Sequence, residues 1–167
     1  GMTDLYLVFF EIGFNMLKPD GQLCYITPSS WLSSVAADNM RRYILTHQNL
    51  TSLIDLEHFQ AFDKITTYTL VSHFKKSYNR SAFNYYTYNG KANCCNFVES
   101  LNLQDIYIDS CFYIGRKRDL EVLRNIKTTK SPKYVSVKNG FATLADAVFI
   151  GEDIPDSPIT IKAIKGS

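Results

Sequence analysis

The sequence predicts an α/β fold, built from one half of a doubly wound parallel sheet and its helices. Three observations predict this class. Apolar residues recur at helical spacing over residues 4–17, a short apolar run bounded by turn residues follows at 22–27, and the pattern then continues in the order helix, strand, strand as far as residue 74. Because half of such a sheet leaves one strand edge unpaired, we expect more of the domain to lie upstream.

The first predicted helix, over residues 4–17, carries a wide apolar stripe. Its apolar positions are Leu5, Phe9, Ile12 and Met16, with a second row at Phe10, Phe14 and Leu17. Thr3 or Asp4 can cap the start of this helix. The segment 18–21 predicts a stop and a turn, because proline cannot continue a helix and Asp-Gly tolerates positive φ.

Residues 22–27 predict the first strand. The run is short, apolar and flanked by turn residues, which is typical of a strand that is buried on both faces of a parallel sheet. Residues 28–31, Pro-Ser-Ser-Trp, leave this strand at the end where open α/β sheets place their ligand sites. We therefore expect them to lie beside a site.

The later elements follow from the same patterns. We expect a helix over 37–47, strands over 50–56 and 66–74, a strand or arm over 81–88 that ends in an Asn-Gly turn, a basic helix over 115–127, and short strands over 134–167. The last group of strands predicts a second, β-rich unit.

Composition and charge describe an ordinary soluble globular domain. The chain has 167 residues, of which 46% are hydrophobic and 20% are charged. No apolar run approaches the roughly 20 residues of a membrane-spanning helix, so we expect no membrane partner. The formal charge of +2 hides a gradient: residues 64–138 hold thirteen basic and five acidic residues, whereas residues 1–63 hold three and seven. A basic middle segment is typical of a surface that meets a polyanion.

Several motifs of common sites are absent from the sequence. The glycines form no G-x-G loop for phosphate groups, and His47, His58 and His73 have no partnered nucleophile motif. The cysteines, at 24, 94, 95 and 111, show no spacing of a zinc site, so we interpret them as reduced thiols and expect no metal. With no secretory signal at the start, we expect a cytoplasmic protein.

Two blocks of motifs carry a resemblance to a known family. Residues 4–76 contain Asp-Leu-Tyr-x-x-Phe-x-Glu, then Leu-Lys-Pro-Asp-Gly, a strand ending Ile-Thr-Pro-x-x-Trp-Leu, Met-Arg-Arg, Leu-Ile-Asp-Leu, a loop with Phe62, and a strand followed by Lys-Lys. In this order they closely resemble the C-terminal half of the catalytic domain of Taq-type (gamma-class) adenine-N6 DNA methyltransferases of restriction-modification systems. Residues 137–150 are similar to the opening of the target-recognition domain in the same family.

The resemblance implies a fold and a division into domains. Residues 1–80 are expected to form the C-terminal half of a Rossmann-like S-adenosylmethionine methyltransferase sheet. Residues 81–133 are expected to be a basic connecting segment with a helix at about 116–127, and residues 134–167 the start of a truncated, β-rich target-recognition domain.

The resemblance also implies roles for particular residues. Phe9 matches the aromatic whose ring lies against the adenine of S-adenosylmethionine, and Phe62 matches the aromatic that stacks on the target adenine after it is extruded from duplex DNA. Both roles suit an aromatic face, which restores stacking that the base has lost. Candidates for contacts to DNA phosphates are Lys64, Lys75, Lys76, Arg80, Arg116, Lys117 and Arg118.

The chain departs from this family at its catalytic motif. The Asn/Asp-Pro-Pro-Tyr/Phe motif and the upstream cofactor loop are missing, since every proline stands alone. We therefore expect a fragment of the enzyme with no catalytic residue in this chain, inactive without the N-terminal half of the catalytic domain. A non-catalytic nucleic-acid-binding module is the alternative. A protein-glutamine methylase shares the chemistry, but the 137–150 patch argues against it.

Overall fold

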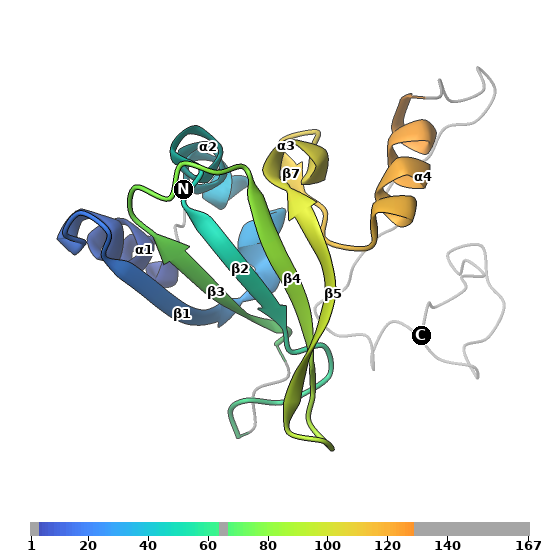
Figure 1. Cartoon of the computed structure of the whole chain (residues 1–167), viewed down its shortest axis with the longest axis horizontal. Coiled ribbons are helices and arrows are strands. Elements are labelled where there is room, and N and C mark those ends of the chain that lie inside the picture. Colours follow the sequence, from blue (N-terminus) through green and yellow to red (C-terminus); the bar gives the residue numbers. More distant parts are fainter. Residues whose placement is uncertain (1–3, 64–66, 129–167) are drawn as a thin grey trace, which may run out of the picture. The chain divides into compact units, whose positions relative to one another are not determined.

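The computed structural model describes residues 4–63 and 67–128, and a five-stranded mixed sheet lies at its centre (Figure 1). The strands follow the spatial order β1-β3-β2-β4-β5. Their bounds are β1 Gln22–Pro28, β2 Leu50–Asp55, β3 Thr69–Lys75, β4 Ala82–Asn89 and β5 Cys94–Asn102. β3 runs antiparallel to β1 and β2, β2 and β4 are parallel, and β5 returns antiparallel to β4. The α/β fold class is confirmed, although only one pair of neighbouring strands is parallel.

The prediction that β1 is buried on both faces of a parallel sheet is wrong. Within residues 4–63 and 67–128, β1 is an edge strand that pairs with β3 alone, from Gln22 opposite Lys75 to Pro28 opposite Thr69. Its residues alternate between exposed and partly buried positions. An apolar run shows that a strand forms but does not show which strands lie beside it. Here β3 lies between β1 and β2, and β1 is the outermost of the five strands.

Helices α1 (Leu5–Met16) and α2 (Asp38–His47) confirm two predicted helices, and they pack beside each other. Only one row of the α1 stripe is buried. Phe10 and Phe14 meet the Phe74 ring edge-on at 5.7 and 5.0 Å between ring centroids. The other row stays exposed: Leu5, Phe9, Ile12 and Met16. Two neighbouring apolar rows were expected to pack together, but the core accommodates one of them.

Trp31 belongs to the core and not to a ligand site. It lies in a short 3-10 helix, Ser29–Leu32, that follows β1, and its side chain is fully buried between Phe10 and Phe112. A second short 3-10 helix, Val35–Ala37, leads into α2. Residues 28–31 were expected to lie beside a site, but Trp31 of this segment packs in the core instead.

Arg41 on α2 connects three segments of the fold from inside the core. Its side chain is 1% exposed, and its guanidinium donates to the carbonyl oxygens of Trp31 and Ser34 at 2.8 Å and of Ser110 at 2.6 Å. Sequence reasoning grouped Arg41 with the exposed Arg42 in one motif and gave neither a structural role. The guanidinium is satisfied by main-chain carbonyls, which makes the burial of its charge tolerable.

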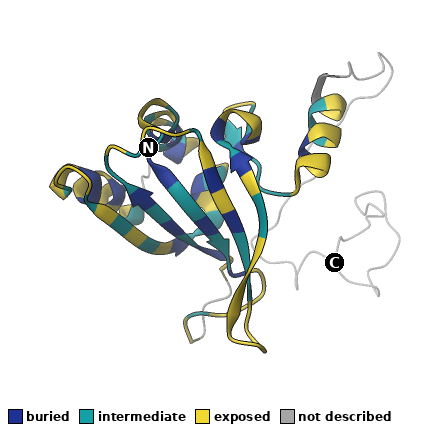
Figure 2. Ribbon diagram, viewed as in Figure 1, coloured by how far each residue is buried: buried dark blue, intermediate teal, exposed yellow. Residues whose placement is uncertain are grey.

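The strands predicted over 50–56 and 66–74 and the predicted strand or arm at 81–88 are confirmed as β2, β3 and β4. Four further elements escaped prediction: β5, the short helix α3 (Leu103–Ile106), and the paired strands β6 (Tyr107–Ile108) and β7 (Cys111–Phe112). The first four residues of β5 are all exposed (Figure 2), so apolar and polar residues do not alternate there. The pairing of β5 with β4 shows that it is a strand.

The basic helix is confirmed as α4, Lys117–Thr128, whereas the strands expected over 134–167 lie outside the described residues. β4 and β5, which follow residue 80, hydrogen-bond into the same sheet as β1, β2 and β3. The division at residues 80 and 133 stays a prediction. No helix within residues 4–63 and 67–128 has the length and apolar character needed to cross a membrane.

Candidate functional site

The strands β1, β2 and β4 end at the same edge of the sheet, which we call the carboxyl edge. Pro28 and Asp55 pair with the neighbouring residues Thr69 and Leu70 of β3, and Asp55 pairs with Thr87 near the end of β4. This is the edge at which open α/β sheets bind ligands. A pocket of about 450 Å³ opens there, lined by Ser29, Leu32, Asp55, Glu57, His58, Tyr68, Leu70 and Ile114.

The loop that follows β2 carries Phe62 and is described over residues 56–63, and residues 67–68 lead into β3. Glu57, His58 and Tyr68 of these two stretches line the pocket. The Asp55 carboxylate accepts the Glu57 N–H at 2.8 Å, and the Phe59 N–H donates to the Leu56 carbonyl at 2.8 Å. Glu57 adopts a left-handed backbone with φ of 49°, which turns the chain sharply after β2. The Phe62 side chain is 45% exposed, so its ring is available to a ligand.

Further aromatic rings accompany Phe62 in this loop. The rings of His58 and Tyr68 meet edge-on at 5.7 Å, and the Phe59 ring meets the Tyr88 ring of β4 edge-on at 4.8 Å. Sequence reasoning singled out Phe62 alone. The sequence also shows several aromatic residues close together between β2 and β3, namely Phe59, Phe62 and Tyr68. Aromatic side chains on such a connection are not explained by core packing, and this feature could have indicated the wider group.

The pocket has an acidic wall. Burial raises the pKa of the Tyr85 phenol to about 12, and the carboxylates of Asp55 and Glu57 add to that rise. Tyr85 on β4 is therefore a neutral hydroxyl group at physiological pH, and the charge of the wall comes from the two carboxylates. In the part of the chain that the structure describes, no three His, Cys, Asp or Glu side chains gather to hold a metal ion.

Phe9 lies on α1 in the exposed row with Leu5, Ile12 and Met16. Its ring is half-exposed, and its carbonyl oxygen accepts a hydrogen bond from the Tyr25 hydroxyl of β1 at 3.3 Å. The row therefore flanks the edge strand. Tyr6, in the same sequence motif, hydrogen-bonds Ser30 after β1 at 2.9 Å between the two hydroxyl oxygens, and this contact ties the start of α1 to the carboxyl edge.

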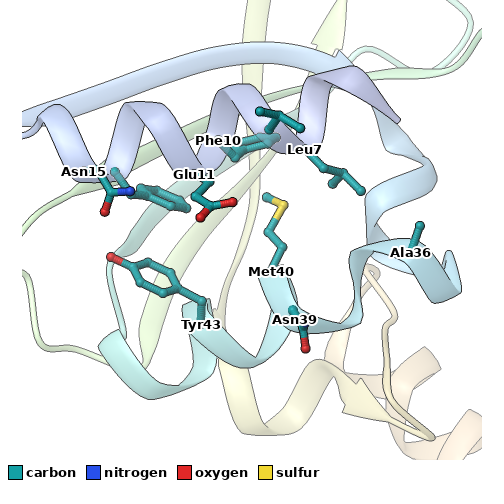
Figure 3. Close-up of a pocket in the computed structure, with 10 residues that line it drawn as sticks. Leu7, Phe10, Glu11, Asn15, Ala36, Asn39, Met40 and Tyr43 are labelled. Carbon is teal, nitrogen blue, oxygen red and sulfur yellow. The ribbon is translucent and has the colours of Figure 1, made fainter. Parts of the chain in front are cut away.

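A second pocket of about 470 Å³ lies between α1 and α2 and does not involve Phe9 (Figure 3). Its lining mixes apolar side chains such as Leu7 and Met40 with Glu11, Asn39 and Tyr43. It belongs to the helix layer and has none of the residues that the sequence singled out for a site. The pocket at the carboxyl edge is thus the better candidate on chemical grounds.

Lys75 and Lys76 lie at the opposite edge of the sheet. The Lys75 ammonium is 3.6 Å from the Asp20 carboxylate, and the Lys76 ammonium donates to the Leu17 carbonyl at 2.6 Å. Strand β3 runs about 20 Å between this edge and the carboxyl edge. The structure therefore does not bring these two lysines together with Phe62.

The second basic group lies closer to the pocket. Lys117 and Arg118 begin α4, Arg116 directly precedes this helix, and the pocket residue Ile114 precedes Arg116 by two positions. The Lys117 main-chain N–H donates to the Glu99 carboxylate at 2.8 Å, and its ammonium lies 3.7 Å from the same group. Arg116 and Arg118 are exposed. Lys64 lies outside the described residues, and Arg80 is exposed with its guanidinium 5.8 Å from the centre of the Tyr78 ring.

Comparison with known proteins gives the site a context. Residues 1–62 match the family model described as Eco57I restriction-modification methylase. The chain is 26% identical to the type II restriction enzyme and methyltransferase RM.Eco57I of Escherichia coli, in an alignment that covers 90% of this chain and 16% of that protein. This chain resembles a restriction-modification methylase. The resemblance expected from the sequence motifs is confirmed.

One solved structure agrees on the fold. The methyltransferase subunit of a type I restriction-modification system from Streptococcus thermophilus matches with a TM-score of 0.52 and 16% identity, over 62% of this chain and 28% of that one. The type IIG restriction endonuclease BpuSI matches with a TM-score of 0.45 and 13% identity, over 53% of this chain and 10% of that one. The chain spans less than a third of the length of each of these three proteins.

Proposed function

We propose that this chain is part of a site-specific DNA methyltransferase that transfers a methyl group from S-adenosylmethionine to adenine N6 in duplex DNA, within a restriction-modification system. The observation that carries the proposal is the exposed Phe62 ring on the connection between β2 and β3, which also supplies Glu57, His58 and Tyr68 to the pocket at the carboxyl edge. It stands in a chain that resembles restriction-modification methylases.

Phe62 would stack on the target adenine. An enzyme that modifies the amino group of adenine must take the base out of the helix, and the extruded base loses its stacking partners. An aromatic side chain recovers roughly 1–3 kcal/mol of that stacking. Phe62 fits this role because its ring is exposed and its loop starts where β2 ends, at the carboxyl edge.

Phe9 would lie against the adenine of S-adenosylmethionine. Its ring fits such a contact because it is half-exposed on α1, while the neighbouring Phe10 fills the core. The bound cofactor would supply the methyl group. The role of this chain toward it would be to hold the adenine ring by contact with the Phe9 ring, and no residue of this chain would act on the methyl group.

The upstream half of the catalytic domain would complete the sheet at β1. The outer edge of this strand has no neighbour among the described residues, and the exposed apolar row of α1 flanks it. An unpaired edge beside an apolar row is a surface that another part of a domain covers. The isolated chain would therefore be inactive, because it lacks both the catalytic motif and the strands that carry it.

Arg116, Lys117 and Arg118 would contact the phosphates of the DNA that reaches Phe62. The first of them, Arg116, lies two positions after the pocket residue Ile114 along the chain. Lys64, two positions after Phe62 in the sequence, is a further candidate. Lys75 and Lys76 would instead hold the opposite edge of the sheet through Asp20 and the Leu17 carbonyl.

Substitution of Phe62 tests the proposal in the intact protein that contains this chain. Phe62→Ala should lower kcat/KM for methyl transfer to DNA by about 5- to 150-fold, which corresponds to the lost stacking. Phe62→Trp keeps an aromatic face and should retain most of the activity. Equal activity of the alanine variant and the unsubstituted protein contradicts the stacking role. DNA binding without any methyl transfer by the unsubstituted protein would favour the non-catalytic binding module.

A further inference from the structure

We infer that the tip of the β4–β5 hairpin holds the β2–β3 loop through Phe59 and thereby positions the Phe62 ring. Phe59 is a positioning residue, and this role rests on the proposed function of Phe62 as the stacking partner of the extruded base. Figure 1 shows the hairpin tip and the loop projecting together from the lower end of the sheet. Their sequences are about thirty residues apart, so the contact is a property of the fold.

The contact between loop and hairpin is made by an aromatic pair and a glycine. The Phe59 ring meets the Tyr88 ring edge-on with 4.8 Å between centroids. A Cβ atom at Gly90 would lie 2.7 Å from Cδ2 of Phe59, which is closer than a carbon contact allows. The Phe59 ring therefore lies against the main chain of the hairpin tip, and a side chain at position 90 would displace it.

Gly90 is needed for space and not for its backbone conformation. The Asn-Gly pair predicts a turn because glycine tolerates positive φ. In the described residues, however, no glycine has positive φ, and Asn93 takes the left-handed conformation in this turn with φ of 49°. Glycine is therefore needed at position 90 because the Phe59 ring occupies the space that a Cβ atom would fill.

The hairpin tip is itself well braced. The strands pair as far as Asn89 opposite Cys94. The Tyr88 hydroxyl donates to the Asn93 side-chain oxygen at 2.6 Å, and the Asn89 side-chain oxygen accepts the N–H groups of Lys91 and Ala92 at 3.1 Å. Phe59 therefore packs on a support whose polar groups are satisfied.

Fixing Phe59 restricts Phe62. The two residues are three positions apart, so their Cα atoms lie within about 11 Å of each other whatever the loop does. On the other side of Phe59, the loop is tied to β2 by the Asp55 contact to Glu57 and to β3 by the Leu56 N–H bond to the Thr69 carbonyl at 3.2 Å. Loss of the Phe59 ring would leave the segment that carries Phe62 without its contact to the hairpin.

Amide hydrogen exchange on this chain tests the contact without any reference to methyl transfer. Phe59→Ala and Gly90→Ala should each raise exchange at the hydrogen-bonded amides of residues 56, 57 and 59 by about tenfold, the size of one aromatic contact. The matched control is Phe97→Ala, because Phe97 is exposed to a similar degree and meets Tyr86 of β4 edge-on at 5.6 Å, away from the loop. Phe59→Tyr should restore protection. Equal exchange in the Phe59→Ala and Phe97→Ala variants would overturn the inference.

A double-mutant cycle in the intact protein tests whether the contact acts through Phe62. Phe59→Ala should lower kcat/KM for methyl transfer by about tenfold when Phe62 is present and have almost no effect when Phe62 is already alanine. A purely structural role would produce the same loss in both backgrounds, and that result overturns the positioning role alone. No methyl transfer by the unsubstituted protein contradicts the proposed function, and hydrogen exchange still decides whether the hairpin holds the loop.

Discussion

Replacement of the buried Arg41 by methionine should destabilise the fold strongly. Methionine fills much of the space of the arginine stem but donates no hydrogen bond. The carbonyl groups of Trp31 and Ser110 then lose their donor, and the Ser34 carbonyl keeps only the Ala37 N–H at 3.2 Å. A buried polar group left unpaired costs about 1–3 kcal/mol, and removal of the buried charge recovers part of this sum. We expect Arg41→Met to lower the free energy of unfolding by about 3–5 kcal/mol.

The neighbouring Arg42 provides the control. Its side chain is 65% exposed and pairs with Asp38 at 2.9 Å, so Arg42→Met should cost less than about 1 kcal/mol. Unfolding in urea can be followed by the fluorescence of Trp31, because this fully buried side chain is the single tryptophan of the chain. If Arg41→Met and Arg42→Met reduce the free energy of unfolding by similar amounts, the reasoning from buried hydrogen bonds is refuted.

Three further predictions concern the phenol of Tyr85, the basic residues and the isolated chain. Burial raises the pKa of Tyr85 from 10.0 to about 12, so the contribution of its neutral phenol to stability is complete below pH 10 and is lost as the pH rises toward 12. In urea unfolding, the free energy of unfolding should therefore decline less over this pH range in the Tyr85→Phe variant than in the unsubstituted chain. Arg116→Ala and Arg118→Ala should each reduce the salt dependence of DNA binding by about one unit of log–log slope, whereas Lys75→Ala should leave both slope and affinity unchanged in the same titration. This chain alone should give no radiolabelled DNA when incubated with labelled S-adenosylmethionine, and turnover would contradict the need for an upstream half.

Local patterns allowed the helices and most strands to be predicted from sequence. Apolar periodicity placed α1, α2 and α4, and β-branched and aromatic runs placed β2 and β3. The neighbours of each strand could not be predicted in this way, because pairing depends on residues far away in sequence. For this reason β1 was expected in the interior of a parallel sheet and is instead an edge strand, and β5 was missed.

The candidate site shows the same limit. Phe62 was found from its motif, but its neighbour Phe59 acquires its contact from a hairpin that follows about thirty residues later. Lys75 and Arg116 were equal candidates for phosphate contacts in the sequence. The length of β3 separates Lys75 from the carboxyl edge, whereas Arg116 lies two positions after the pocket residue Ile114. Arg41 and Arg42 are adjacent in sequence, and the helical turn directs only the first into the core.

The most direct test of the account is to identify the methylated nucleoside. The intact protein that contains this chain is incubated with S-adenosylmethionine and unmethylated DNA, and the DNA is digested to nucleosides and analysed by mass spectrometry. We expect the nucleoside of N6-methyladenine, with a yield that falls when Phe62 is replaced by alanine. Methylated cytosine in place of methylated adenine, or no methylated nucleoside at all, would contradict it.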